Sequence, residues 1–88
     1  MKHRANPKFW HFYNKLPSDI QRLADESYDL LRKAPFHPSL HFKKVGRFWS
    51  VRVGIYYRAV AVQKDSYIVW FWIGRHDEYE RLIGSRWT

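Results

Sequence analysis

The stretch from Arg47 to Tyr79 constrains the fold most, because aromatic and β-branched residues dominate it and turn residues divide it. Within this stretch, Tyr67 to Gly74 is an unbroken apolar run, which is typical of a central strand covered on both faces. Phe48 to Val53, and Tyr56 or Tyr57 to Gln63, have the same strand-forming composition. The sequence therefore predicts three consecutive strands joined by short turns.

The length of the turn between the first two of these strands decides which side chains share a face. A two-residue loop would send Arg52 and Arg58 to opposite faces, whereas a three-residue loop, Gly54 to Tyr56, would pair them directly. The longer loop is favoured because it gathers large and small apolar residues on the other face, namely Trp49, Val51, Val53, Tyr57, Ala59 and Ala61. Two like charges side by side on a sheet are destabilising, which indicates an anion between them.

The first part of the chain predicts a helical hairpin, preceded by a short edge strand from Lys2 to Ala5. Asn6-Pro7 resembles a helix N-cap followed by proline in the first turn, and the helix is expected to run to about Lys15. Ser18 to Gln21 fits a capping box, in which serine and glutamine satisfy each other's free amides. A second amphipathic helix is expected from there to Lys33, and its apolar stripe needs a surface to cover.

The remaining segments complete an α+β fold. Phe42 to Val45 could form a short strand that ends at Gly46, and His76 to Tyr79 begins a final short helix with Gly84 as a plausible C-cap. The prediction is a single domain, residues 1–88, in which a helical hairpin packs on a twisted, mainly antiparallel sheet with a short C-terminal helix.

The charge balance points to an acidic partner. The 88 residues include 16 Lys and Arg against 8 Asp and Glu, a formal charge of +8. Nucleic acid is the leading candidate because phosphate neutralisation releases counterions, an acidic protein is second, and a membrane is weaker because no apolar run approaches ~20 residues. The absence of cysteine excludes thiol chemistry, and with no visible signal peptide it fits the cytoplasm.

A basic set near the strands is the strongest functional signal. It could form a positively charged trough for nucleic acid, with Trp49, Tyr56 or Trp72 stacking on unpaired bases. The alternative is a solvated strand surface that prevents edge aggregation. The set consists of Lys43, Lys44, Arg47, Arg52, Arg58 and Arg75.

His76 is the best placed residue that titrates near neutrality, because it follows a strand and starts a helix. It could act as a general acid or base, or simply bond a carbonyl. Tyr79, one turn further, could donate to a phosphate oxygen or pack in the core. His37 and His41 have a metal-like spacing, but the proline between them argues against a metal site. No glycine-rich phosphate loop, carboxylate pair or Ser-His-Asp pattern is visible, and no cofactor is expected.

The order of these motifs resembles the RelE/ParE superfamily of toxins from bacterial type II toxin-antitoxin pairs. The likeness covers essentially the whole chain and is most specific at Arg52 to Gly54, at Tyr57-Arg58 and at Ile73 to Tyr79. It implies a β-α-α-β-β-β-α fold, in which a helical hairpin packs on a twisted antiparallel sheet. It also implies an antitoxin partner that wraps the toxin and blocks it.

The resemblance implies two possible activities. RelE-like members cut mRNA in the ribosomal A site, whereas ParE-like members poison DNA gyrase by binding. In the first case Arg58 would hold the scissile phosphate, His76 would take the place of a catalytic arginine or histidine, Tyr79 would match the C-terminal tyrosine, and Arg52 would match a basic strand residue. We therefore expect a ribosome-dependent endoribonuclease that needs no metal, with a gyrase inhibitor as the alternative and a non-toxic RNA-binding module as a third possibility.

Overall fold

The computed structural model describes residues 2–87, with side chains as far as residue 84. Its helices and strands lie close to those that the sequence predicts. They are β1 (Lys2–Ala5), α1 (Pro7–Tyr13), α2 (Ser18–Lys33), a single 3-10 turn (Pro38–Leu40), β2 (Lys43–Val45), β3 (Phe48–Val53), β4 (Tyr57–Lys64), β5 (Tyr67–Arg75) and α3 (His76–Trp87).

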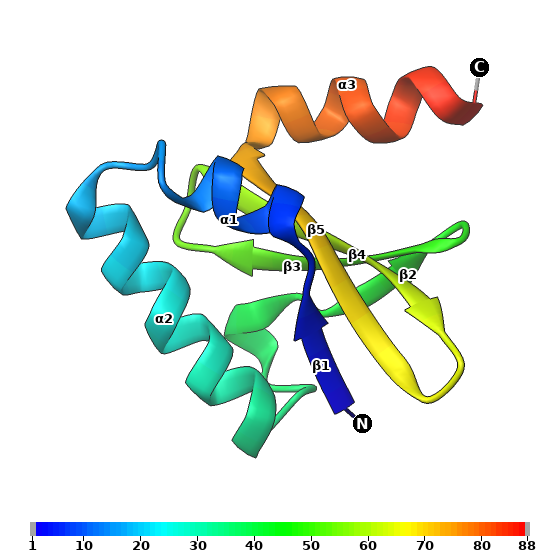
Figure 1. Cartoon of the computed structure of the whole chain (residues 1–88), viewed down its shortest axis with the longest axis horizontal. Coiled ribbons are helices and arrows are strands. Elements are labelled where there is room, and N and C mark those ends of the chain that lie inside the picture. Colours follow the sequence, from blue (N-terminus) through cyan, green and yellow to red (C-terminus); the bar gives the residue numbers. More distant parts are fainter. Residues whose placement is uncertain (1, 88) are drawn as a thin grey trace.

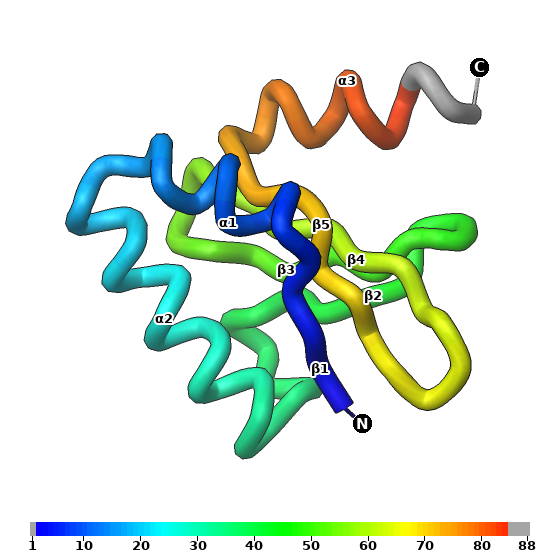
Figure 2. The backbone as a smooth tube through the Cα atoms, in the orientation of Figure 1, coloured from blue at the N-terminus to red at the C-terminus, as the bar shows by residue number. Residues whose placement is uncertain are grey.

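The strands form one five-stranded sheet in the order β1-β5-β4-β3-β2 (Figure 1). β1 pairs parallel with β5, and every other neighbouring pair is antiparallel. The backbone tube shows how α1 and α2 carry the chain across the sheet between β1 and β2 (Figure 2). The predicted α+β fold with a mainly antiparallel sheet is therefore confirmed. β5 is an inner strand, as expected, but the middle of the sheet is β4.

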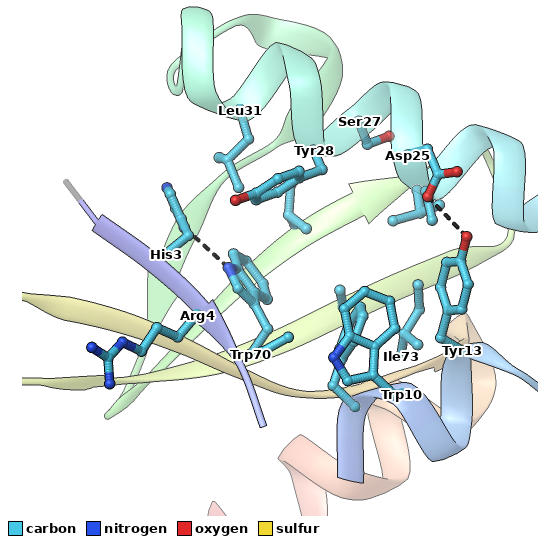
Figure 3. A pocket seen from close by; sticks show the side chains of 16 residues that line it. His3, Arg4, Trp10, Tyr13, Asp25, Ser27, Tyr28, Leu31, Trp70 and Ile73 are labelled. Carbon is cyan, nitrogen blue, oxygen red and sulfur yellow. Dashed lines mark hydrogen bonds between the residues drawn. The ribbon is translucent and has the colours of Figure 1, made fainter. Parts of the chain in front are cut away.

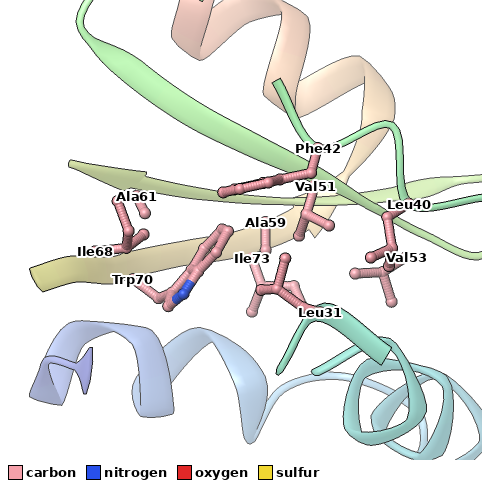
Figure 4. Close-up of a cluster of buried hydrophobic side chains, with 10 residues drawn as sticks. All are labelled: Leu31, Leu40, Phe42, Val51, Val53, Ala59, Ala61, Ile68, Trp70 and Ile73. Atoms are coloured by element: carbon pink, nitrogen blue, oxygen red, sulfur yellow. The ribbon is translucent and has the colours of Figure 1, made fainter. Parts of the chain in front are cut away.

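The helices cover the two faces of the sheet unequally, and the larger buried cluster lies between the sheet and the helical hairpin (Figure 4). We call the two sides the hairpin face, which α1 and α2 cover, and the α3 face. Burial on the hairpin face is extensive because both strand and helix residues contribute, among them Leu31, Val51, Ala59, Trp70 and Ile73. The cluster on the α3 face is smaller and consists of Phe48, Val60, Tyr79 and Ile83, with partly buried neighbours around it. Much of the α3 face is thus left only partly covered.

The β3–β4 hairpin has the register that parity predicts. Arg52 lies opposite Arg58 and Val53 lies opposite Tyr57, so the connection is the three-residue loop. Gly54 starts this loop with a φ of +62°, in the left-handed region that glycine adopts without steric penalty. The predicted apolar set lies on the hairpin face, and both arginines lie on the α3 face.

A bulge in β5 was not predicted. Val60 pairs with Trp72 and Ala61 pairs with Trp70, so Phe71 is an extra residue. The extra residue reverses the alternation of β5, and both Phe71 and Trp72 pack with the α3-face cluster while Trp70 and Ile73 remain on the hairpin face.

Helix ends are predicted less well than the helices themselves. Asn6 caps α1 as expected, since its side chain accepts a hydrogen bond from the Phe9 amide at 3.1 Å. The capping box is wrong: α2 begins at Ser18 without a side-chain cap, and Gln21 donates to the Tyr13 carbonyl at 3.0 Å instead. Gly84 does not end α3, which continues to Trp87.

Candidate anion-binding site

Arg52 and Arg58 differ from the other cationic side chains that the structure describes. Both are half-buried, whereas every other lysine and arginine among the described side chains is exposed. The only ion pairs within 4.0 Å in the described part of the chain are Arg75–Asp77 and His76–Glu80. The two arginines thus lie opposite one another on the α3 face without a neutralising carboxylate in direct contact.

The guanidinium of Arg58 is destabilised by its surroundings. Burial and the positive charge of Arg52 lower its pKa, while Tyr79 and Glu80 act in the opposite direction. Its Nη1 group donates to the Tyr57 carbonyl at 2.9 Å, which fixes the side chain against its own strand. A bound anion would relieve the repulsion, and the remaining N–H groups of the fork are suited to a phosphate.

Arg52 is held in place by two neighbours. Its Nε group donates to the Gly54 carbonyl at 3.0 Å, so the hairpin loop orients the guanidinium. Its Nη1 atom lies 3.4 Å from Nε2 of His41. Because a guanidinium nitrogen has no acceptor capacity, Nε2 of His41 can take only the acceptor role in this contact.

Tyr79 reaches the sheet from the first turns of α3. Its hydroxyl donates to Oγ of Ser50 at 3.4 Å, and both side chains are buried. Its phenol group is one of two neighbours that act to raise the pKa of Arg58, against the larger lowering by burial and by Arg52. The structure therefore places Tyr79 beside the arginines, but with its hydroxyl directed at the sheet.

His76 lies at the junction of β5 and α3. Its amide donates to the Tyr56 carbonyl at 2.7 Å, which ties the start of the helix to the β3–β4 loop. Its ring stacks on Tyr79 with centroids 5.9 Å apart, and Nε2 lies 3.4 Å from Oε1 of Glu80. The imidazole is partly exposed beside the site, with a carboxylate that can orient it.

The other residues of the predicted basic trough are divided between the two faces. Lys43 pairs with Ser50 and so shares the face of the arginines, whereas Lys44 pairs with Trp49 on the hairpin face. Trp49 stacks on Phe42 with centroids 4.7 Å apart, away from the arginines.

Three further residues of the trough lie at its margins. Arg75 pairs with Tyr57, hence lies on the hairpin face, and contacts Asp77 at 3.6 Å. Arg47 lies over the Phe48 ring in the β2–β3 turn. Tyr56 is 65% exposed in the β3–β4 loop next to the site, where its ring is accessible for stacking.

Three residues of this site were not singled out for it by sequence reasoning. His41, Ser50 and Glu80 contact Arg52, Tyr79 and His76 respectively. Glu80 could have been found from its i,i+4 spacing to His76 on a helix. His41 gives no such signal, because its position depends on a left-handed backbone at φ 46° after the 3-10 turn.

A separate apolar cavity of about 220 Å³ lies between the helical hairpin and the sheet (Figure 3). A bond from the Tyr13 hydroxyl to Asp25 at 2.9 Å and one from Trp70 Nε1 to His3 Nδ1 at 3.0 Å lie at its margin. Trp10 and Tyr28, which line it, are 49% and 43% exposed. The cavity belongs to the hairpin side and is distinct from the arginine pair.

No group of three or more histidine, aspartate or glutamate residues within residues 2–84 is arranged to hold a metal ion. No helix in the described part of the chain is long and apolar enough to cross a membrane.

The hairpin-covered mixed sheet with a C-terminal helix on its other face is also the fold of solved RelE and YoeB/ParE toxins. Three solved structures share it. A chain of the RelB-RelE antitoxin-toxin complex from Methanococcus jannaschii superposes with a TM-score of 0.69 at 13% identity, over 90% of this chain and 96% of that chain. The YoeB/ParE toxin from Agrobacterium tumefaciens gives 0.66 at 15% identity, over 86% and 99%.

The isolated E. coli RelE toxin gives a TM-score of 0.61 at 11% identity, over 97% of both chains. No family model and no curated protein sequence matches the chain. The relationship is therefore one of fold, and the chemistry has to be argued from the residues of this chain.

Proposed function

We propose that this chain is a cytoplasmic toxin of a type II toxin-antitoxin pair and acts as a ribosome-dependent mRNA endoribonuclease. The observation that supports this most is the paired, half-buried Arg52 and Arg58 on one face, without a carboxylate within 4.0 Å among the described side chains. Such a pair is suited to the additional negative charge that a phosphate acquires during cleavage. A RelE of the same fold is in complex with its antitoxin, and we propose an antitoxin partner here.

The proposed reaction is an internal transesterification of the mRNA backbone. The 2′-hydroxyl oxygen attacks the adjacent phosphorus, the bond from phosphorus to the 5′ oxygen breaks, and a 2′,3′-cyclic phosphate and a 5′-hydroxyl result. The proton leaves the 2′-hydroxyl and a proton reaches the departing 5′ oxygen, so the step requires no metal or water. His76, oriented by Tyr79 and Glu80, would move the proton.

The arginines would supply transition-state stabilisation. Arg58 and Arg52 are already oriented by the Tyr57 and Gly54 carbonyls, so little reorganisation is required when charge develops. The loss of one such preorganised donor costs ~3 kcal/mol, or roughly 10²–10³ in rate. Lys43 on the same face and Tyr56 beside it would contact the flanking nucleotides.

The test is the substitution Arg58→Ala, with Arg22→Ala as the matched control on the exposed side of α2. Induction of Arg58→Ala should no longer inhibit growth, while the variant still folds and still binds the antitoxin. Arg22→Ala should remain toxic. Sequencing of mRNA 5′ ends after brief induction of the parent chain should show new cuts with intact DNA. Unchanged toxicity of Arg58→Ala would reject the assignment.

A gyrase inhibitor is the second candidate, because the helical hairpin exposes large apolar side chains. Trp10, Leu23 and Tyr28 are 49%, 38% and 43% exposed on α1 and α2, as expected for a protein-binding surface. In this case Trp10→Ala, and not Arg58→Ala, would abolish toxicity. Induction would produce double-strand DNA breaks with uncut mRNA.

A further inference from the structure

A second group of unneutralised cations lies at the far end of β5. Tyr67, the first residue of β5, pairs with Lys2 on one side and with Lys64 on the other. Directly paired residues project from the same face of a sheet, so the two lysines flank the tyrosine in one row. Arg4 pairs with Val69 in the next row. We call these four residues, Lys2, Arg4, Lys64 and Tyr67, the Tyr67 cluster.

The Tyr67 cluster lies on the same face of the sheet as the arginine pair. Arg58 and Lys64 are both even-numbered residues of β4, which pairs with β3 without a register shift, and Val62 between them packs with the α3-face cluster. Along β5 the two sites are roughly 20 Å apart at about 3.3 Å per residue. One extended polyanion on this face could therefore contact both sites.

The contacts within the cluster are those of a preorganised phosphate-binding site and not of a sheet edge whose side chains extend freely into solvent. The Arg4 guanidinium lies 4.1 Å from the Tyr67 ring centroid, and the Lys2 ammonium lies 5.7 Å from it. Stacking on the ring holds the guanidinium by its face and leaves the N–H groups at its edge available for a bidentate phosphate contact. Asp65 in the adjoining turn makes no ion pair within 4.0 Å with these cations in the described structure.

A cleft next to the cluster provides space for a ligand. Its volume is about 430 Å³, and it lies at the β1 edge of the sheet, where Lys2 and Tyr67 line it together with Arg32 from the last turn of α2 on the hairpin side. His3 also lines this cleft, and burial together with nearby positive charge, including that of Arg32, lowers its pKa. The cleft therefore holds two permanent cations, Lys2 and Arg32, beside the side chains of Tyr28, Leu31 and Pro35, and the two cations favour an anionic ligand.

We propose that the Tyr67 cluster and Arg32 form a second RNA-binding site, which holds backbone phosphates of a single-stranded segment at a distance from the arginine pair. The identification of RNA as the ligand rests on the proposed function. The site would anchor the RNA without taking part in cleavage, and each phosphate held there adds about 0.7 to the slope of log affinity against log salt.

The experiment measures binding separately from cleavage. In an Arg58→Ala background, we expect Lys2→Gln with Arg4→Gln to weaken binding of a fluorescent single-stranded RNA of about 12 nucleotides, a length within the usual site sizes. The salt slope measured by fluorescence anisotropy should decrease by about 1.4. Between 50 and 200 mM salt, the RNA affinity of the Arg58→Ala parent should therefore fall by a factor about seven times larger than that of the cluster variant. The control, Lys15→Gln with Arg22→Gln, removes the same charge from the helical hairpin and should leave the slope unchanged.

Further variants keep the result interpretable. If the β1 variant does not fold by circular dichroism, Lys64→Gln in β4 replaces it, with an expected slope decrease of about 0.7. Equal slopes for the cluster variant and the control would overturn the proposal. The proposal would also be overturned if the cluster variant bound RNA as well as its parent but lost binding to phosphatidylserine vesicles or to polyglutamate. That result would identify a membrane or an acidic protein as the ligand. A slope change in a chain whose Arg58→Ala variant is still toxic would support the RNA site while rejecting the nuclease.

Discussion

The repulsion between Arg52 and Arg58 predicts a particular sign in a double-mutant cycle. The perturbation is Arg52→Gln and Arg58→Gln, singly and together. Each single substitution removes the repulsion and also the hydrogen bond to a backbone carbonyl, at 3.0 Å for Arg52 and 2.9 Å for Arg58. The double substitution removes the same repulsion only once. Its free energy of unfolding should therefore be lower than the value obtained by adding the two single changes to the parent chain.

The expected magnitude follows from directly opposed side chains on one face of a sheet. Like charges in this arrangement are destabilising by about 0.2–1 kcal/mol. The lost carbonyl bonds appear in both the single and the double variants, so they cancel in the cycle. For a domain of this size the coupling corresponds to about 1–8 °C in melting temperature.

The assay is thermal or urea denaturation of all four proteins at low salt and at 1 M salt. The coupling should decrease at 1 M salt, where the Debye length is about 3 Å. The same cycle on Arg22 and Arg81, which lie on helices covering opposite faces of the sheet, should give no coupling. A coupling of opposite sign at low salt would mean that the two guanidinium groups stabilise each other, and the inference of an anion between them would be refuted.

Two further predictions concern His3 and Gly74. Burial lowers the pKa of His3 most, and neighbouring positive charge lowers it further, so the folded chain binds this proton less readily than the unfolded chain. Stability should therefore fall as pH falls from about 6.5 towards the lower pKa of the folded state. The urea midpoints at pH 7 and pH 5 should differ less for His3→Gln than for the parent chain. A Cβ at Gly74 would lie 2.6 Å from Cζ2 of Trp72; Gly74→Ala should therefore destabilise the fold by about 1–3 kcal/mol and alter tryptophan fluorescence, whereas an unchanged melting curve would show that the indole moves freely.

Strand parity is the reason that the arginine pair could be predicted from sequence. Side chains alternate with a period of two, so once the apolar set of β3 and β4 is placed on the hairpin face, Arg52 and Arg58 have only one direction left. The N-cap of α1 was predictable for a similar reason, because Asn6-Pro7 is a local signal that needs no tertiary contact.

The features that sequence reasoning missed depend on tertiary contacts. Tyr67 to Gly74 is apolar at every position except its ends, so it carries no alternation from which the bulge at Phe71 could be read. The Gln21 side chain donates to the Tyr13 carbonyl across the α1–α2 turn, so it is not available for a capping box. His41 reaches Arg52 only because its backbone is left-handed, a conformation that nothing in the local sequence specifies.

The unequal cover of the two faces explains where the cations can be. On the hairpin face, a guanidinium at the position of Val51 or Ala59 would be buried among apolar side chains and would lose its hydration without compensation. On the α3 face, Tyr79 and Ile83 cover only the middle of the sheet, so side chains beyond them keep contact with solvent. Charged residues of the strands are therefore tolerated beyond both sides of α3 on one face. This is the arrangement that a polyanion crossing that face would require.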